Sequence, residues 1–248
     1  MQPGREADVR GNRHFVGLLL SAWLAGFAVA PMHADSDPAS GLKSLLRQLS
    51  LTEEGANGWL DRLGAWEGGP AHERLLAVTE SGAVVHSLDG DGTRVVLTPE
   101  FDRDLLRDGA ALVLVHNHPT GTSLSSNDIS HLAKGGVLAV VAIGHDGSIY
   151  AASRGPHFYA LWCEAERYAN LRKDVRWAML FEGTFTDGLH FPFESYAAHL
   201  AALALSKAGV IDYAARMAPD RRAAYDDRRA AFGRIVAFAA ARIKKVSN

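Results

Sequence analysis

The spacing of apolar residues along the chain predicts strands in its middle part and helices on both sides. Short apolar runs bounded by glycine, aspartate or proline are typical of strands. Runs of this kind lie at 75–78, 83–88, 95–97, 110–115, 137–143 and 148–152. Helical spacing separates several of them, first from Pro99 to Gly109 and then from Ser125 to the pair Gly135-Gly136. Strands mixed with helices in this way predict an α/β (α+β) fold, with a mixed sheet flanked by helices.

The pattern also divides the chain into four parts. Residues 1–34 contain Arg5, Arg10 and Arg13 ahead of an uncharged apolar run at 15–30, which predicts a secretory leader. The run is shorter than the roughly 20 residues that a membrane-spanning helix needs, so export to the periplasm or the medium is favoured over an uncleaved anchor. The remaining parts are an N-terminal helical segment at 35–69, an α/β domain at 70–155 and a helical C-terminal region at 156–248.

Composition narrows the classes of partner. The formal net charge is -2, which gives no electrostatic reason to expect nucleic acid or an anionic membrane surface as a partner. Cys163 is the sole cysteine, so neither an intramolecular disulfide nor a zinc site built from several cysteines can form. Its apolar, helical surroundings favour a buried structural thiol over a nucleophile.

Two histidines, His116 and His118, follow the predicted strand 110–115 and precede Pro119. Side chains in extended backbone alternate with a period of two, so both imidazoles project to the same side and can reach one metal ion. Asp128, on the first turn of the next predicted helix, would supply a third ligand across a short loop. Two imidazoles and one carboxylate, with a fourth position left open, describe a catalytic zinc site.

These residues also have a purely structural interpretation. A His-x-His pair alone is more often a pair of surface or packing histidines than a metal site. Ser125 and Asp128 form the pattern Ser-x-x-Asp, a variant of the capping box, so both could simply cap the helix. Capping does not exclude catalysis, and the combination of both patterns after a buried strand favours a metal site. His131 lies three residues after Asp128 and could form hydrogen bonds that orient the metal ligands.

The order of these motifs resembles that of a known family. Glu73 comes just before the first apolar run, His-Asn-His-Pro follows at 116–119, and Ser-Ser-Asn-Asp follows at 125–128. This order resembles the JAMM (Jab/MPN-type) metalloproteases, in particular their bacterial RadC-like, phage- and toxin-associated branch, over residues 71–153. The resemblance implies a JAMM/cytidine-deaminase-like mixed sheet.

The resemblance further implies a set of site residues. Zn²⁺ would be bound by His116, His118 and Asp128, with Glu73 as general acid/base and Ser125 as hydrogen-bond donor to the oxyanion. The implied reaction is hydrolysis of an amide or isopeptide bond in a protein or peptide substrate by a metal-activated water.

Two positions have alternatives. The loop between Pro119 and the serines is shorter than in many family members, so Ser126 is the alternative to Ser125. Glu80 and Glu67 also lie upstream of the histidines, and Glu73 is preferred because it directly precedes the first apolar run.

Two other functions are open as well. A relative of this family can keep the fold and the metal yet act only as a binding module. The His-Asn-His string could also indicate a metal-dependent nuclease, which the missing basic stripe and the predicted leader disfavour.

Overall fold

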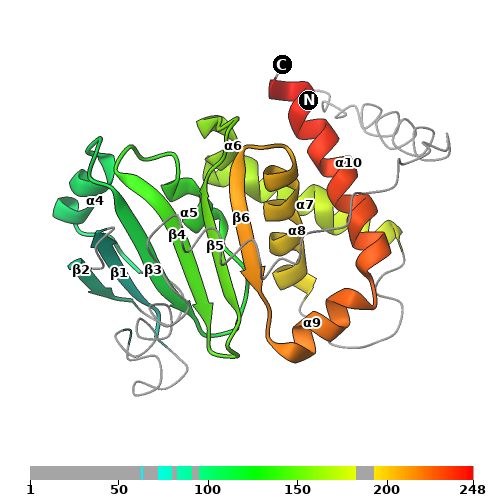
Figure 1. Ribbon diagram of the computed structural model, residues 1–248, viewed down its shortest axis with the longest axis horizontal. Coiled ribbons are helices and arrows are strands. Elements are labelled where there is room, and N and C mark those ends of the chain that lie inside the picture. Colours follow the sequence, from blue (N-terminus) through cyan, green and yellow to red (C-terminus); the bar gives the residue numbers. More distant parts are fainter. Residues whose placement is uncertain (1–62, 64–71, 80–82, 91–94, 183–192, 248) are drawn as a thin grey trace, which may run out of the picture. The chain divides into compact units, whose positions relative to one another are not determined.

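A computed structural model describes Leu63 together with residues 72–79, 83–90, 95–182 and 193–247 (Figure 1). The predicted leader at 1–34 lies outside the described residues, as does the predicted helical segment 35–69 apart from Leu63. Among the helices that the structure describes, none is long and apolar enough to cross a membrane.

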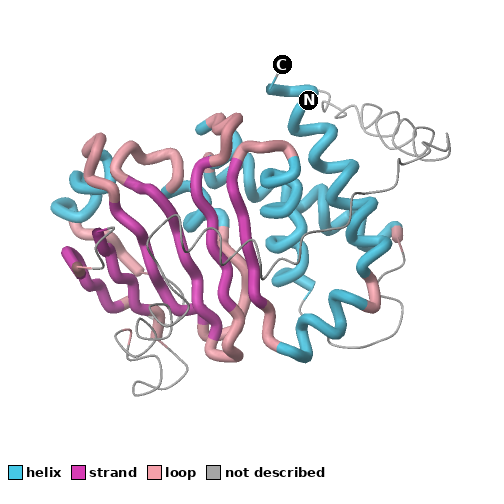
Figure 2. Tube along the Cα trace, in the orientation of Figure 1, coloured by secondary structure: helices cyan, strands magenta, loops and turns pink. Residues whose placement is uncertain are grey.

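A mixed six-stranded sheet forms the centre of the fold, in the order β2-β1-β3-β4-β5-β6 (Figures 1 and 2). Strands β3 and β4 pair in parallel, and the other neighbours pair antiparallel. The strands are β1 (Arg74–Thr79), β2 (Val84–Asp89), β3 (Leu112–His118), β4 (Val137–Gly144), β5 (Ile149–Arg154) and β6 (Ile211–Arg216). The mixed sheet flanked by helices confirms the fold class that the sequence predicts.

Helices pack on one face of this sheet and extend beyond β6 (Figure 1). They are α4 (Pro99–Leu106), α5 (Ser126–His131), α6 (Ala160–Cys163), α7 (Ala165–Phe181), α8 (Phe193–Lys207), α9 (Pro219–Asp226) and α10 (Arg229–Ser247). Alternate strand residues such as Leu114 and Val140 join the helices in one apolar core. Their neighbours, such as Val113 and Val141, form a second buried cluster on the opposite face, which includes Leu63. β3 is therefore buried on both faces, as its unbroken apolar run predicts.

Two predicted elements in the middle of the chain need correction. Residues 95–97 form no strand, because this segment leads directly into α4, where Thr98 caps the helix and Pro99 opens it. The helix predicted from Ser125 to the glycine pair ends at His131. It stops early because Gly136 lies against the end of α4, where its N–H donates to the Leu105 carbonyl at 2.8 Å.

The C-terminal region is not helical throughout, contrary to the prediction for 156–248. Residues Ile211–Arg216 form β6, which pairs with β5 and becomes the edge of the sheet. Pairing satisfies backbone groups of β5 that would otherwise lack partners. After β6 the chain is helical again, in two separate helices, α9 and α10. The C-terminal region is thus joined to the sheet that carries the predicted site.

Candidate metal centre

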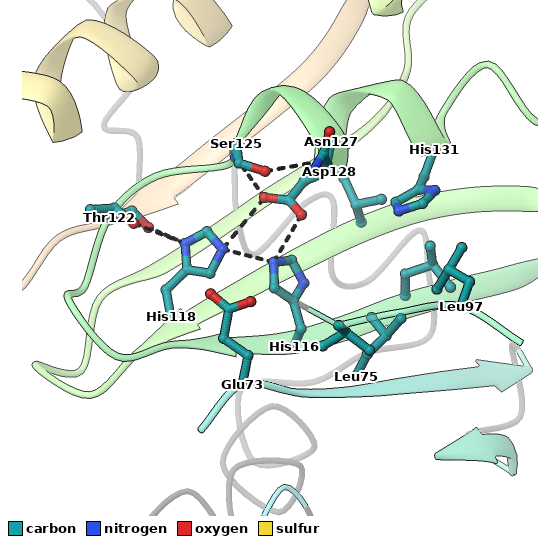
Figure 3. A pocket seen from close by; sticks show the side chains of 13 residues that line it. Glu73, Leu75, Leu97, His116, His118, Thr122, Ser125, Asn127, Asp128 and His131 are labelled. Atoms are coloured by element: carbon teal, nitrogen blue, oxygen red, sulfur yellow. Dashed lines mark hydrogen bonds and ion pairs between the residues drawn. The ribbon is translucent and has the colours of Figure 1, made fainter. Parts of the chain in front are cut away.

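The two motif histidines lie at the carboxyl end of β3, on the face covered by the helices. His116 and His118 are 5% and 6% exposed, and their Nε2 atoms are 2.9 Å apart. Asp128 directs Oδ1 to the Nε2 of His116 at 3.1 Å and Oδ2 to the Nε2 of His118 at 3.4 Å (Figure 3). All three ligand atoms lie within 4.8 Å of one another. The residues that the sequence predicts as ligands therefore converge and could hold one metal ion.

The surroundings of His118 suit a metal ligand. Its Nδ1 lies 2.8 Å from the carbonyl oxygen of Thr122. A carbonyl only accepts, so Nδ1 carries a proton, and Nε2, which faces Asp128, is the nitrogen that would coordinate a metal ion after giving up its own proton. Thr122 belongs to the loop between the two motifs, and no sequence pattern marked it beforehand.

Asp128 also caps α5, as the structural interpretation predicted. Its Oδ2 accepts a hydrogen bond from the backbone N–H of Ser125 at 2.6 Å, while the Ser125 Oγ accepts one from the Asp128 N–H at 3.2 Å. This reciprocal capping box fixes the carboxylate against the first turn of the helix. Because the same carboxylate faces both histidines, capping orients the third ligand instead of competing with it.

The electrostatics of the site favour a cation. Burial alone would raise the pKa of Asp128, but the charge of His116 and hydrogen bonds from both imidazoles outweigh it and hold the pKa well below its usual range. Asp128 is therefore a carboxylate. Burial would lower the pKa of His118, but its hydrogen bond to Asp128 outweighs this effect, so the net shift is upward. A divalent cation would stabilise the buried carboxylate in the same way as the positive charge and hydrogen bonds of the imidazoles do.

Glu73 immediately precedes β1 and lines the same cavity as the ligands. In the antiparallel register Leu75 is opposite His116, so Glu73 comes next to His118 along the same face. Its carboxylate faces the imidazoles in Figure 3. The structure thus brings Glu73 to the ligands, whereas the alternatives Glu80 and Glu67 lie outside the described residues.

Asn117 holds the backbone on both sides of Glu73. Its Oδ1 accepts a hydrogen bond from the Arg74 N–H at 2.6 Å, and its Nδ2 donates to the His72 carbonyl at 2.8 Å. Its side chain points away from the ligands, as the strand period predicts, and it is only 2% exposed. The amide therefore ties the strand that carries the histidines to the segment that carries Glu73.

Asn117→Ala is expected to destabilise the fold by about 1–3 kcal/mol, because it removes a buried amide and both of its hydrogen bonds to the His72 and Arg74 backbone. The measurement is the free energy of unfolding from urea titration. Asn170→Ala, at an exposed position on α7, is the matched control and should change it little. Equal stability of the two variants would contradict this role for Asn117.

The C-terminal region holds the loop between the two motifs. The Ser123 hydroxyl lies 2.8 Å from that of Tyr213 on β6, and the Tyr213 hydroxyl lies 2.9 Å from the Nδ1 of His199 on α8. Arg221 on α9 donates to the Thr120 carbonyl at 2.6 Å. Sequence reasoning missed the contacts of Tyr213 because they depend on β6, which was not predicted. It missed the contact of Arg221 because α9 is far from the loop in sequence.

The ligands open onto a cavity of about 240 Å³. Besides the ligands, Glu73 and Ser125, it is lined by Leu75, Val95, Leu97, Leu114, Thr122, Asn127, His131 and Val140. His131 therefore lies beside the site, but its nitrogens do not join the three ligand atoms. Within the described part of the chain, no other group of histidines, cysteines and acidic residues has metal-binding geometry.

Cys163 lies apart from this chemistry. It is fully buried, and burial raises the pKa of its thiol to about 12. The thiolate is therefore scarce at neutral pH, which agrees with the predicted structural role.

Comparisons of the chain with protein-family models, with curated proteins and with solved structures find no match. The function is therefore inferred from the site. Its five predicted residues, His116, His118, Asp128, Glu73 and Ser125, all line one cavity.

Proposed function

We propose that this protein is a zinc-dependent amide hydrolase of the JAMM type, acting on a peptide or isopeptide bond. The supporting observation is the convergence of two imidazoles and one carboxylate from separate elements, with Glu73 and Ser125 lining the same cavity. A structural zinc site would be closed by four protein ligands. Three ligands beside an accessible cavity are the arrangement of a catalytic site.

The donor set fits zinc. Two neutral imidazole nitrogens and one carboxylate oxygen are typical ligands of catalytic Zn²⁺, and the hydrogen bond from His118 to Thr122 provides the required tautomer. When bound, zinc polarises a carbonyl group and lowers the pKa of water to about 7. This chemistry suits amide hydrolysis at neutral pH.

The protein residues would then move the protons and stabilise charge. Glu73 takes a proton from the attacking water and delivers it to the departing amine, which is general acid/base catalysis. Ser125 already accepts a hydrogen bond from the Asp128 N–H, so its own hydroxyl proton is free to point into the cavity. There it donates to the oxygen that becomes negatively charged in the tetrahedral intermediate.

The proposed substrates are proteins or peptides outside the cytoplasm, if the leader at 1–34 directs export as its pattern predicts. Cross-linked peptides of a cell wall, an exported precursor and an isopeptide conjugate are candidates of the same bond class. None of them requires nucleic acid as a partner.

The proposal is tested with purified protein loaded with zinc and assayed against peptide and isopeptide libraries by mass spectrometry. We expect one zinc per chain and cleavage that a chelator abolishes and added zinc restores. Zinc binding without cleavage of any library member would favour a binding module. Chelator-sensitive cleavage of DNA or RNA would favour a nuclease.

A further inference from the structure

The cavity beside the ligands changes from polar to apolar along the sheet. Glu73 immediately precedes β1 and is followed on the same face by Leu75 of β1. On β3 the order on that face is His118, His116 and Leu114. The polar end of the cavity therefore continues past His116 into an apolar part. The apolar residues that line this part are Leu75, Val95, Leu97, Leu114 and Val140.

The floor of this apolar part is formed by buried residues of the sheet. Leu75 lies opposite His116 in the β1–β3 register, and Leu114 pairs with Val140 of β4. The side chains of these two leucines and of Val140 belong to the helix-covered core and are at most 6% exposed. A substrate group that enters would therefore lie over core side chains of three neighbouring strands.

The outer wall comes from residues 95–97, directly before α4. Val95 and Leu97 are partly buried and pack against the core, whereas Val96 between them is 68% exposed. Thr98 caps α4 immediately afterwards, accepting from the Phe101 N–H at 3.2 Å, and so anchors the end of this segment. Because successive side chains of this segment point in opposite directions, Val95 and Leu97 both line the cavity while Val96 faces solvent.

The far side of the cavity is formed by α5. His131 lines it, and the ring stands above Leu97 in Figure 3. The Nδ1 of His131 is buried and has no hydrogen-bond partner among the described residues. A buried polar atom without a partner is uncommon, and a bound molecule with a polar backbone group could satisfy it.

We propose that this apolar part is a substrate subsite, which accepts an aliphatic side chain next to the scissile amide and rejects a charged one. The inference rests on the proposed function and adds the class of substrate. Protein interiors contain few voids larger than a water molecule, so an accessible apolar space beside reactive groups indicates a binding site. Among the residues that the structure describes, no lysine, arginine, aspartate or glutamate lines the apolar part, so a charged side chain would be desolvated there without a partner from this part of the chain.

The test uses hydroxamates, which share one zinc-binding head group and differ in their tails. Zinc-loaded protein is titrated calorimetrically with acetohydroxamate, isocaproyl hydroxamate and succinic monohydroxamate. We expect the branched aliphatic tail to bind at least roughly tenfold more tightly than the acetyl group, because it buries several additional methylene equivalents. The carboxylate tail should give no such gain.

Two neighbouring variants locate the effect. Leu97→Ser should remove most of the gain from the aliphatic tail, whereas the matched Val96→Ser variant should keep it, since Val96 faces solvent. Circular dichroism and zinc content check that both variants are folded and loaded. Equal binding of all three hydroxamates, or an unchanged gain in Leu97→Ser, would overturn the subsite.

The two proposals can fail separately. A tail preference that depends on Leu97, without cleavage of any amide, would support the subsite and contradict the hydrolase. Amide cleavage without a tail preference would support the hydrolase and contradict the subsite. A protein that binds no zinc would overturn both.

Discussion

Glu73→Gln should lower kcat for amide hydrolysis by roughly 10²–10⁴-fold, with zinc content unchanged. Glutamine has nearly the same shape as glutamate, but it cannot take a proton from water near neutral pH. Glu73 is not one of the three ligand residues, so the metal should stay bound. The measurement is kcat with the best library peptide, together with zinc content by elemental analysis.

The control for this variant is Glu166→Gln. Glu166 is exposed on α7 and does not line the cavity, so the same chemical change there should leave kcat unaltered. Full activity of Glu73→Gln would contradict the proposed general acid/base. If Glu73→Gln lost its zinc, the role of Glu73 would be metal binding instead.

Asp128→Asn should weaken zinc binding by more than roughly 100-fold, since loss of a residue that only supports a ligand already weakens binding 10–100-fold. Asparagine keeps an oxygen that can accept from the Ser125 N–H, so the cap of α5 is retained. It removes the negative charge that faces both imidazoles. Affinity is measured by competition with a chromophoric chelator.

Thermal unfolding gives an independent measure of zinc binding by this variant. Zinc that binds the folded state should raise the Tm of the unmodified protein by mass action, and it should raise the Tm of Asp128→Asn far less. Asp212→Asn, at an exposed position on β6, is the matched control and should respond to zinc like the unmodified protein. Equal zinc affinity of both variants would remove Asp128 from the ligand set.

The parts of the site that were predicted correctly are encoded locally. His116 and His118 share a face because they are two residues apart on a strand, and the apolar run before them identifies that strand. Ser125 and Asp128 meet because a capping box spans three residues at a helix start. Such relations hold wherever the strand or helix forms, so they can be inferred without knowing the fold.

The elements that were wrong depend on distant partners. Residues 95–97 have the composition of a strand but form a cavity wall, because the chain enters α4 immediately afterwards. Ile211–Arg216 forms a strand because the edge of β5 is available for pairing. Intrinsic strand propensity is weak relative to such tertiary effects.

By itself, the sequence determined the α/β class, the same-side placement of the two histidines and the capping pair that orients Asp128. Only the tertiary structure decided that Glu73 lies beside His118, that Asn117 holds it there and that apolar side chains continue the cavity. The reason is physical: strand periods and helix caps act over a few residues, whereas the register between β1 and β3 joins residues more than thirty positions apart.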